Sequence, residues 1–323
     1  MVHAIRIHQH GGPEVMKWEA VDVGAPAAGE VRVKQHAVGL NYIDTYHRSG
    51  LYKIALPAVI GMEGAGEVVA VGSGVTEFKA GDRVAYANPM GSYAEERVIP
   101  AERLLGLPSG IDYKTAAGMM LQGMTVRYLL RQTHKIGSHT VMLFHAAAGG
   151  VGLIACQWAK HLGATIIGTV SSEDKAKLAK AHGCTHVINY KTEDFVKRTK
   201  EITGGQGCDV VYDSIGKDTY PASLDCLKPF GLWASFGSAS GAITNFDLAL
   251  LAGKGSLYAT RPTLFTYTAK RADLVANANE LFDVVQKGIV KININQTYPL
   301  KEAAQAHRDL EGRKTTGSTV LLP

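Results

Sequence analysis

Cysteine is scarce in this chain of 323 residues, and none occurs before residue 156. The four cysteines are Cys156, Cys184, Cys208 and Cys226. They form no Cys-x-x-Cys pair, which argues against both a disulfide framework and a structural zinc site made of closely spaced cysteines. We therefore expect four reduced thiols, most of them buried.

Long apolar runs are also missing. No stretch approaches the ~20 consecutive apolar residues that are needed to cross a bilayer. The segment Met1–Arg6 lacks the apolar core of a secretory signal. A cytosolic location is the expectation that follows.

Charge of one sign does not accumulate anywhere along the chain. The formal net charge of +5 is spread out and forms no basic tail. This pattern suits a small anionic ligand better than a nucleic-acid track, although weak RNA binding by a diffuse basic surface stays open. With 46% apolar and 20% charged residues, the composition is that of a globular protein. The length favours two lobes that share one cleft.

The first ~120 residues have the alternation of apolar and polar positions that is typical of strands. Examples are Glu30–Lys34 and Gly66–Val71, and turn signals such as Gly72-Ser73-Gly74 separate them. This part is predicted to be a twisted, mainly antiparallel β lobe.

From Asp112, which can cap a helix, the spacing of apolar residues becomes helical up to Leu129. Strands and helices then alternate. The expected strands cover 140–145, 165–170, 186–189, 209–213 and 232–236, and the expected helices 150–161, 173–181, 193–202 and 220–227. This order predicts a doubly wound parallel sheet with a ligand crevice at the carboxyl ends of its strands.

A sixth strand is expected over 256–259, and no further strand–helix–strand unit follows it. A long helix over 269–287 and strands over 296–300 and 318–322 are expected instead, and they are expected to return to the first lobe. The predicted α/β organisation is therefore a β lobe over 1–124, a dinucleotide-binding domain over 125–262 and a C-terminal segment over 263–323.

The sharpest local motif is the run His145–Gly152, which lies between an apolar strand and a helix. Small residues let backbone amides approach a pyrophosphate, and the start of the helix contributes partial positive charge. Against the pattern Gly-x-Gly-x-x-Gly, Ala147 takes the first place, followed by Gly149 and Gly152. The strand–loop–helix context favours a dinucleotide site over a merely tight turn.

The residues at the end of the second strand of this domain indicate which dinucleotide it binds. Enzymes that use NAD usually place an acidic residue there to hold the ribose hydroxyls. This chain has Ser171, Ser172 and Lys175, which suit a 2′-phosphate and hence NADPH. Glu173 and Asp174 are interpreted as first-turn residues of the next helix that face solvent.

Four motifs occur in the same order as in one family, and the resemblance covers essentially the whole chain. They are Asn41-Tyr42-Ile43-Asp44-Thr45-Tyr46, Gly61-Met62-Glu63-Gly64-Ala65-Gly66, Leu121-Gln122-Gly123-Met124-Thr125 and Ala146-Ala147-Ala148-Gly149-Gly150-Val151-Gly152. The chain resembles the zeta-crystallin-like quinone oxidoreductases, a zinc-independent branch of the medium-chain dehydrogenases/reductases. This resemblance implies a GroES-like β lobe followed by a Rossmann domain. Zinc-dependent members carry Cys and His where this chain has Asn41 and Met62, so no metal site is expected.

The resemblance also implies roles for individual residues. Asn41, Tyr46, Gln122 and Thr125 are the expected catalytic residues, with Asn41 and Tyr46 beside the nicotinamide and Thr125 at its carboxamide side. The residues expected at the cofactor are Tyr42, Ile43, Asp44, Tyr128, Gly149, Gly150, Val151, Gly152, Ser171, Ser172, Lys175, Tyr190, Ser214, Phe236, Gly237, Ser238 and Arg313. Among these, Arg313 would join the serines and Lys175 at the 2′-phosphate, and Tyr190 would lie near the adenosine. For Tyr46 and Thr125 the alternative is a purely structural role.

The implied activity is NADPH:quinone oxidoreductase. The protein would position hydride donor and acceptor, while the product oxygens take protons from water. A reductase of alkenals or enones, and a non-catalytic NADPH-binding crystallin or RNA-binding role, are the alternatives. The physiological acceptor, and the choice between one- and two-electron transfer, stay open. A homodimer is expected through the sheet edge at Gly255–Thr260, because an exposed edge needs cover.

Overall fold

The computed structural model describes residues 1–323, and they divide into two compact units. Unit 1 comprises residues 1–124, 268–286 and 292–323. Unit 2 comprises residues 125–267 and 287–291. The chain thus leaves unit 1 once for a long excursion and once more for only a few residues after the long C-terminal helix.

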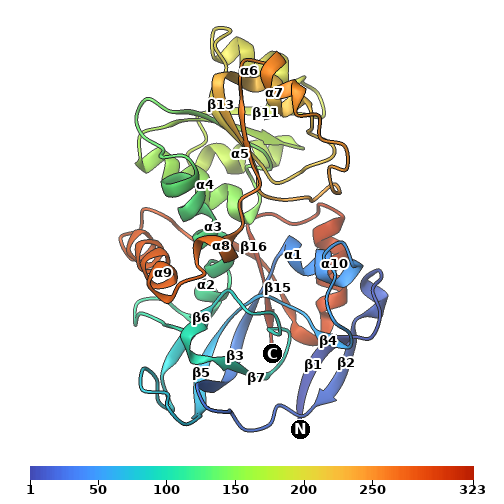
Figure 1. The fold of residues 1–323 in the computed structure, drawn as a ribbon, viewed down its shortest axis with the longest axis vertical. Coiled ribbons are helices and arrows are strands. Elements are labelled where there is room, and N and C mark those ends of the chain that lie inside the picture. Colours follow the sequence, from blue (N-terminus) through green and yellow to red (C-terminus); the bar gives the residue numbers. More distant parts are fainter. The chain divides into compact units, whose positions relative to one another are not determined.

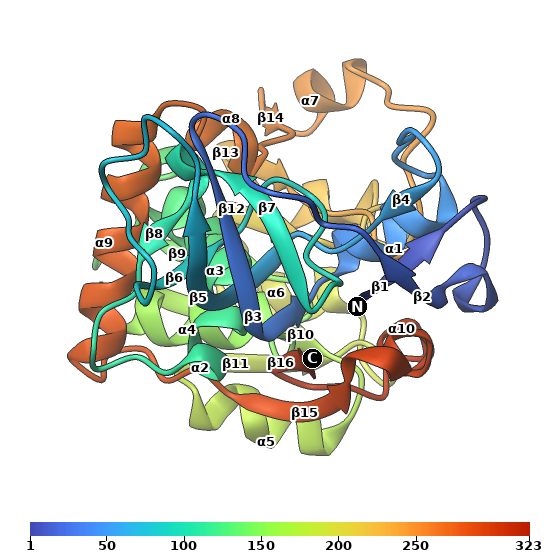
Figure 2. The same ribbon diagram turned by 90° about the horizontal axis from the view of Figure 1, so that it is seen from below.

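Unit 1 is built on a mainly antiparallel sheet in the order β15-β16-β3-β5-β6-β8, with β7 also paired to β3 (Figure 2). A smaller sheet has the order β2-β1-β4. The strands are β1 (Val2–Ile7), β2 (Lys17–Val21), β3 (Glu30–Leu40), β4 (Ala58–Val59), β5 (Glu63–Val71), β6 (Arg83–Tyr86), β7 (Glu96–Pro100), β8 (Leu105–Gly106), β15 (Ile294–Pro299) and β16 (Ser318–Leu322). The last strand lies beside β3, with Val320 opposite Gly39. The antiparallel lobe expected from the alternating pattern is confirmed.

The helices of unit 1 are α1 (Tyr42–Ser49), α2 (Tyr113–Ala117), α9 (Arg271–Gln286) and α10 (Ala303–Glu311), and α3 (Met120–Tyr128) begins here and ends in unit 2. Asp112 caps α2 as expected, because its Oδ1 accepts a hydrogen bond from the Thr115 amide at 2.7 Å. The single helix expected from Asp112 to Leu129 is divided at Gly118. Its carbonyl accepts a hydrogen bond from the Ser318 hydroxyl of β16 at 2.7 Å instead of continuing one helix.

Unit 2 contains one parallel sheet in the order β11-β10-β9-β12-β13-β14. Its strands are β9 (Val141–Phe144), β10 (Thr165–Val170), β11 (His186–Asn189), β12 (Cys208–Asp213), β13 (Leu227–Ser235) and β14 (Tyr258–Thr260), and its helices include α4 (Gly150–His161), α5 (Glu173–Ala181), α6 (Phe195–Ile202), α7 (Ala249–Gly253) and α8 (Leu264–Tyr267) (Figure 1). The predicted doubly wound sheet is confirmed. The edge of this sheet at β14 is the sixth strand that the sequence suggested.

The helix predicted over 220–227 is wrong: this segment is a short 3-10 helix, η4 (Ala222–Cys226). The hydroxyls of Thr219 and Ser223 both donate to the buried carboxylate of Asp213 at the end of β12. These bonds hold the segment against the sheet, and Pro221 supplies no amide for a longer helix. No helix of the structure is long and apolar enough to span a membrane.

Candidate functional site

The loop between β9 and α4 has the backbone of an anion site. Gly149 is the N-cap of α4, and no side chain caps the helix there, so its first amides keep their hydrogen-bonding capacity. A Cβ on Gly149 would meet only the Ala146 carbonyl oxygen, at 3.3 Å. An anionic group therefore fits against this helix start, and Gly150 and Val151, which are half-buried, begin the helix itself.

Two features of the same loop explain its small residues. A Cβ on Gly152 would lie 2.5 Å from the Ala146 oxygen and 2.7 Å from Ala147 Cα, so this glycine serves close packing within the loop. Ala147 is itself fully buried, and a Cβ on Gly168 of β10 would approach its Cβ to 2.6 Å. Ala146 has a left-handed backbone with φ of 57°, a conformation that is uncommon for any residue with a Cβ.

The loop after β10 collects the residues predicted for a 2′-phosphate. Ser172 caps α5, and its Oγ accepts a hydrogen bond from the Lys175 amide at 3.3 Å. Tyr190, at the end of β11, lies beside this loop because its amide donates to the Val170 carbonyl at 3.0 Å. Unit 2 therefore brings Ser171, Ser172, Lys175 and Tyr190 to one end of neighbouring strands.

The two acidic residues in this segment are exposed, as expected. Asp174 pairs with Lys177 at 3.5 Å, while Glu173 accepts a hydrogen bond from the Asn189 side chain at 3.2 Å.

The turns after β12 and β13 also pack together at this edge. The Phe236 amide donates to the Asp213 carbonyl at 2.8 Å, and the Ala239 amide donates to the Ser214 carbonyl at 3.1 Å. A Cβ on Gly237 would lie 2.5 Å from the Ser214 oxygen, so only glycine fits this approach. Ser214, Phe236, Gly237 and Ser238 thus belong to one pair of adjacent turns.

In unit 1 a buried polar cluster surrounds Asn41, the N-cap of α1. Its Nδ2 donates to Glu63 Oε2 at 2.6 Å, and its Oδ1 accepts from Gln122 Nε2 at 3.1 Å. Gln122 Oε1 in turn accepts from the Ser318 hydroxyl at 2.9 Å. The amide of Asn41 is therefore held in one orientation, which leaves one N–H and one oxygen lone pair for a ligand.

Two carboxyl groups of unit 1 have raised pKa values. Burial raises the pKa of Glu63 to about 8, against the hydrogen bonds from Asn41 and the Leu121 amide, and the charge of Asp44 adds to the rise. Burial likewise raises the pKa of Asp44 to about 7, although the Asn41 amide and Tyr93 donate to it. Glu63 is accordingly mostly neutral at pH 7.

Asp44 was expected to bound the cofactor, and the structure places its carboxylate in the interior of unit 1. It is fully buried, and its Oδ2 accepts hydrogen bonds from the Asn41 amide at 2.8 Å and the Tyr93 hydroxyl at 3.1 Å. Tyr93 also contacts His307 Nε2 at 3.0 Å, and burial lowers the pKa of His307 to about 3. The direct contacts of this carboxylate are therefore with its own unit.

Hydrogen bonds and an ion pair join helices α1 and α10. Arg48 donates two hydrogen bonds to the Glu311 carboxylate, at 3.0 and 2.7 Å, and the Tyr42 hydroxyl donates to the Leu310 carbonyl at 3.1 Å. Arg313 follows α10 in the left-handed region with φ of 58°. It belongs to unit 1, whereas Ser171, Ser172 and Lys175 belong to unit 2.

The remaining predicted residues are mostly buried. Tyr46 is 8% exposed, with its ring 5.2 Å from that of Tyr52 in an edge contact, and Ile43 is half-buried on the same helix. Thr125 is 7% exposed on α3. Tyr128 is 2% exposed because its ring stacks on Tyr267, at 4.5 Å between centroids.

Sequence reasoning missed the buried acids at the centre of these clusters. Within the Gly61–Gly66 run, close strand packing requires a glycine at Gly66, since a Cβ there would lie 2.1 Å from the Lys34 oxygen. Glu63 within that run was not singled out, and neither was Asp213. Each lies at the end of a strand, Glu63 at the start of β5 and Asp213 at the end of β12, and the sequence carries no signal that sets them apart from other acids at strand ends.

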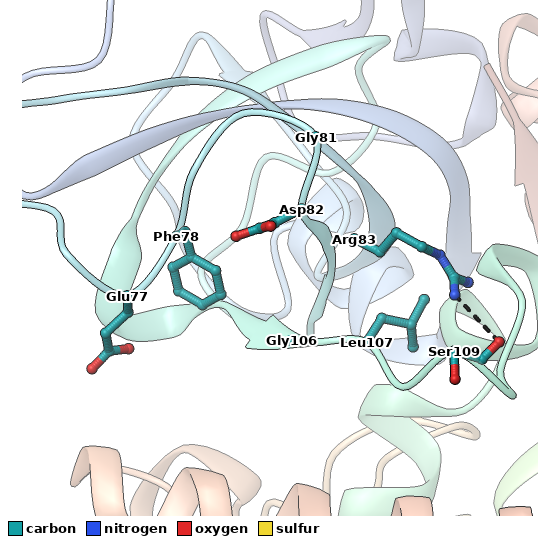
Figure 3. Close-up of a pocket in the computed structure, with 8 residues that line it drawn as sticks. All are labelled: Glu77, Phe78, Gly81, Asp82, Arg83, Gly106, Leu107 and Ser109. Atoms are coloured by element: carbon teal, nitrogen blue, oxygen red, sulfur yellow. Dashed lines mark hydrogen bonds between the residues drawn. The ribbon is translucent and has the colours of Figure 1, made fainter.

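A separate cavity of about 370 Å³ lies on unit 1 and shares no residue with the Asn41 cluster (Figure 3). It is lined by Glu77, Phe78, Gly81, Asp82, Arg83, Gly106, Leu107 and Ser109. Arg83 donates to the Ser109 carbonyl at 3.5 Å, and Asp82 accepts from Lys79, so its charged groups are engaged within the protein. No group of three or more His, Cys, Asp or Glu side chains is placed so that it could hold a metal ion.

Two family models match separate parts of the chain. Residues 27–129 match the alcohol dehydrogenase GroES-like domain, and residues 150–276 match the zinc-binding dehydrogenase domain. These two domains in this order define the medium-chain dehydrogenase/reductase class.

Individual relatives are more specific. Quinone oxidoreductase of Pseudomonas aeruginosa is 54% identical over the full length of both chains. The structure of Escherichia coli quinone oxidoreductase complexed with NADPH has a TM-score of 0.98 at 50% identity, covering 99% of this chain and all of the other. A 2-haloacrylate reductase of Burkholderia sp. is 49% identical over 100% of this chain and 99% of its own. The chain belongs to the zinc-independent quinone oxidoreductase family.

Proposed function

We propose that this protein transfers hydride from NADPH to a quinone. The observation that carries the proposal is the uncapped start of α4, where Gly149 leaves the backbone open, next to the hydroxyls and lysine after β10. Uncapped helix amides bind phosphate, and a second phosphate-binding group nearby distinguishes NADPH from NADH. Relatives named quinone oxidoreductase at 50–54% identity support the choice of acceptor.

The two units have different tasks in this proposal. In unit 2, Gly149–Gly152 hold the pyrophosphate, Ser171, Ser172 and Lys175 hold the 2′-phosphate, and the turns at Ser214 and Phe236–Ser238 adjoin the nicotinamide half. Arg313 is the fourth residue proposed for the 2′-phosphate. The cofactor, when bound, supplies the hydride.

The residues of unit 1 serve the acceptor. Asn41, fixed by Glu63 and Gln122, offers an N–H to a quinone oxygen, and Tyr46 orients the ring. Thr125, the first residue of unit 2, is proposed to hold the carboxamide side of the nicotinamide instead. Since water can protonate the product oxygens, the site needs ordered donors more than a strong acid.

The decisive experiment is a steady-state screen of NADPH oxidation against 1,4-benzoquinone, 1,2-naphthoquinone, an alkenal and an alcohol. We expect turnover with the quinones and none with the alcohol. Calorimetry should give at least about tenfold tighter binding of NADPH than NADH, a difference of about 1.4 kcal/mol. Equal affinities would overturn the assignment of the 2′-phosphate residues.

A compound with a carbon–carbon double bond conjugated to a carboxylate or a carbonyl group is the second candidate acceptor. The 2-haloacrylate reductase is almost as similar to this chain as the quinone oxidoreductases are. Reduction of an activated double bond uses the same hydride but needs a proton on carbon. In the same screen, faster turnover of 2-chloroacrylate or of the alkenal than of any quinone would favour it.

A homodimer through β14 is part of the proposal. This strand is at the sheet edge, and large apolar side chains around it are exposed: Phe230 by 69%, Leu248 by 70% and Tyr258 by 62%. Phe230 adjoins the strand, since its amide donates to the Gly255 carbonyl at 2.9 Å. An unpaired edge with apolar neighbours favours association with a second copy. Light scattering should give a dimer mass, and Tyr258→Lys should shift it toward the monomer.

A metal-free site and a cytoplasmic location complete the proposal. Asn41 and Met62 occupy the positions where zinc-dependent relatives of the class carry ligands, and all four cysteines are free and buried. Activity should survive a strong chelator unchanged. Elemental analysis that finds one zinc per chain would contradict the metal-free site.

A further inference from the structure

A second buried polar cluster lies in unit 2, at the carboxyl ends of three adjacent parallel strands. His145 directly follows β9, Thr169 lies near the end of β10, and Asp213 ends β12. Ser223 comes from η4, between β12 and β13. All four side chains are at most 2% exposed. None of them has a role in the function proposed above.

The hydrogen bonds of this cluster form one continuous chain. Ser223 Oγ donates to Asp213 Oδ2 at 2.9 Å, so it must accept from His145 Nε2, 3.0 Å away. Nδ1 of His145 therefore carries no proton and accepts from the Thr169 hydroxyl at 3.0 Å. Burial lowers the pKa of His145, which keeps the ring neutral and preserves this assignment of donors.

Asp213 connects the chain to further backbone. Its Oδ1 accepts from the amides of Ile215 at 2.9 Å and Gly216 at 3.1 Å, and Oδ2 lies 3.3 Å from the indole nitrogen of Trp233. Burial opposes its charge, but the hydrogen bonds from the Thr219 hydroxyl and the two amides hold the pKa of Asp213 below its ordinary value. The carboxylate thus fixes the turn that begins at Ser214.

A serine, a histidine and an aspartate in hydrogen-bond contact also make up the triad of hydrolases, but this cluster cannot act in that way. The aspartate contacts the serine instead of orienting the histidine. Ser223 is 0% exposed, so no substrate carbonyl can reach its hydroxyl. The cluster must act on its surroundings within unit 2.

Those surroundings are three loops that the proposed function assigns to NADPH. His145 leads into Ala146–Gly152, Thr169 leads into Ser171 and Ser172, and Asp213 leads into the turn at Ser214. We propose that His145, Thr169, Ser223 and Asp213 are positioning residues that set the spacing of the pyrophosphate, 2′-phosphate and nicotinamide loops without touching the cofactor. The inference rests on the proposed function for the identity of the ligand.

The test compares Ser223→Ala with Cys226→Ala, which removes one buried heavy atom from the same 3-10 helix outside the chain of bonds. Thr169→Val breaks the chain at its other end and serves if Ser223→Ala does not fold. Calorimetry should give about tenfold weaker NADPH binding for both chain variants, and affinity within about twofold of wild type for Cys226→Ala. The KM for NADPH should rise while kcat at saturating NADPH changes less than about twofold.

Amide hydrogen exchange of the protein without cofactor supplies a readout independent of the ligand. Ser223→Ala should speed exchange in residues 146–152, 169–172 and 214–217 together, and Cys226→Ala should not. Unchanged NADPH affinity in a folded Ser223→Ala, or equal weakening by Cys226→Ala, would overturn the inference. If wild type binds NADPH but reduces no quinone, the proposed function fails and this inference is still decided by affinity and exchange.

Discussion

Each unit of this protein buries a carboxyl group at the centre of a polar cluster, and the two groups respond in opposite ways. In unit 1 the pKa of Glu63 is raised to about 8, whereas in unit 2 the pKa of Asp213 is lowered. Both side chains are fully buried, so desolvation alone does not account for the difference. The number of hydrogen-bond donors differs between them, and the charge of Asp44 adds to the rise at Glu63.

Asp213 accepts hydrogen bonds from two backbone amides, two hydroxyls and an indole. Glu63 accepts from one amide and one side chain, and Asp44 keeps one oxygen, Oδ1, without a hydrogen-bond partner. A buried carboxylate stays charged where enough donors converge on it and takes up a proton where they do not. In unit 2 the charged carboxylate of Asp213 therefore holds the loops around it. In unit 1 the carboxyl group of Glu63, next to Asn41, is mostly protonated.

The largest effect on NADPH binding is expected from a substitution that places a side chain in the phosphate loop of unit 2. Gly150→Val should abolish measurable NADPH binding, a loss of at least about a hundredfold, because a branched side chain blocks the approach to the helix start. The melting temperature should change little, since Gly150 is half-buried at the surface of the loop. Gly152→Val is the contrasting variant and should lower the melting temperature itself, because its Cβ would lie 2.5 Å from the Ala146 oxygen. NADPH affinity near that of wild type in Gly150→Val would place the cofactor elsewhere.

Amide substitutions test whether the two acids differ in charge. Asp213→Asn should cost about 3 kcal/mol of unfolding free energy, because its NH2 group meets donors and hydrogen bonds to a charge are lost. Glu63→Gln should cost less than about 1 kcal/mol, since it replaces an acid that is mostly neutral. Urea unfolding at pH 7 measures both.

Glu63→Gln has a specific reason to be tolerated. If the new amide donates to Asn41 Oδ1, Asn41 can donate to Gln122 and Gln122 to the Ser318 hydroxyl. Ser318 then keeps the Gly118 carbonyl, 2.7 Å away, as its acceptor. The whole chain of amides reverses without losing a hydrogen bond. Equal destabilisation by the two amide substitutions would contradict the assigned difference in charge.

The sequence predicts the parallel sheet and the phosphate loop, but it does not predict which side chains contact the buried acids. The parallel sheet followed from the alternation of strands and helices, and the phosphate loop from its glycines in that context. The partners of Asp213 could not be predicted, because Ser223 and Trp233 are ten and twenty residues away and only the completed sheet brings them together. The same holds for Glu63, which meets Asn41 across strands that are far apart in sequence.

The two acids should affect the pH dependence of the unfolding free energy in opposite ways. Glu63 has a folded pKa of about 8 against 4.5 in its unperturbed state, and Asp44 about 7 against 3.8. The folded state therefore binds more protons than the unfolded state in this interval, and stability should fall as pH rises from about 5 to 8, by up to about 1.4 kcal/mol per pH unit for each group. Asp213 has the opposite sign, so its contribution is lost only as pH falls below the usual range of aspartate. In urea titrations, Glu63→Gln should flatten the slope between pH 6 and 8, and an unchanged slope would rule out Glu63 as the proton-binding group.

The smallest effect is expected from Tyr46, which tests whether unit 1 positions the acceptor or delivers a proton to it. Tyr46→Phe should lower kcat with 1,4-benzoquinone by about tenfold or less, because the ring packs against Tyr52 in either form and water can protonate the product oxygens. An obligate general acid behaves differently, since its removal costs a factor of about 10² to 10⁴. NADPH affinity, measured by calorimetry, should stay unchanged, which separates this variant from those of unit 2. If turnover vanishes while NADPH still binds, Tyr46 is the proton donor. The carboxyl groups of Glu63 and Asp44 would then be tested as the groups that supply Tyr46 with protons.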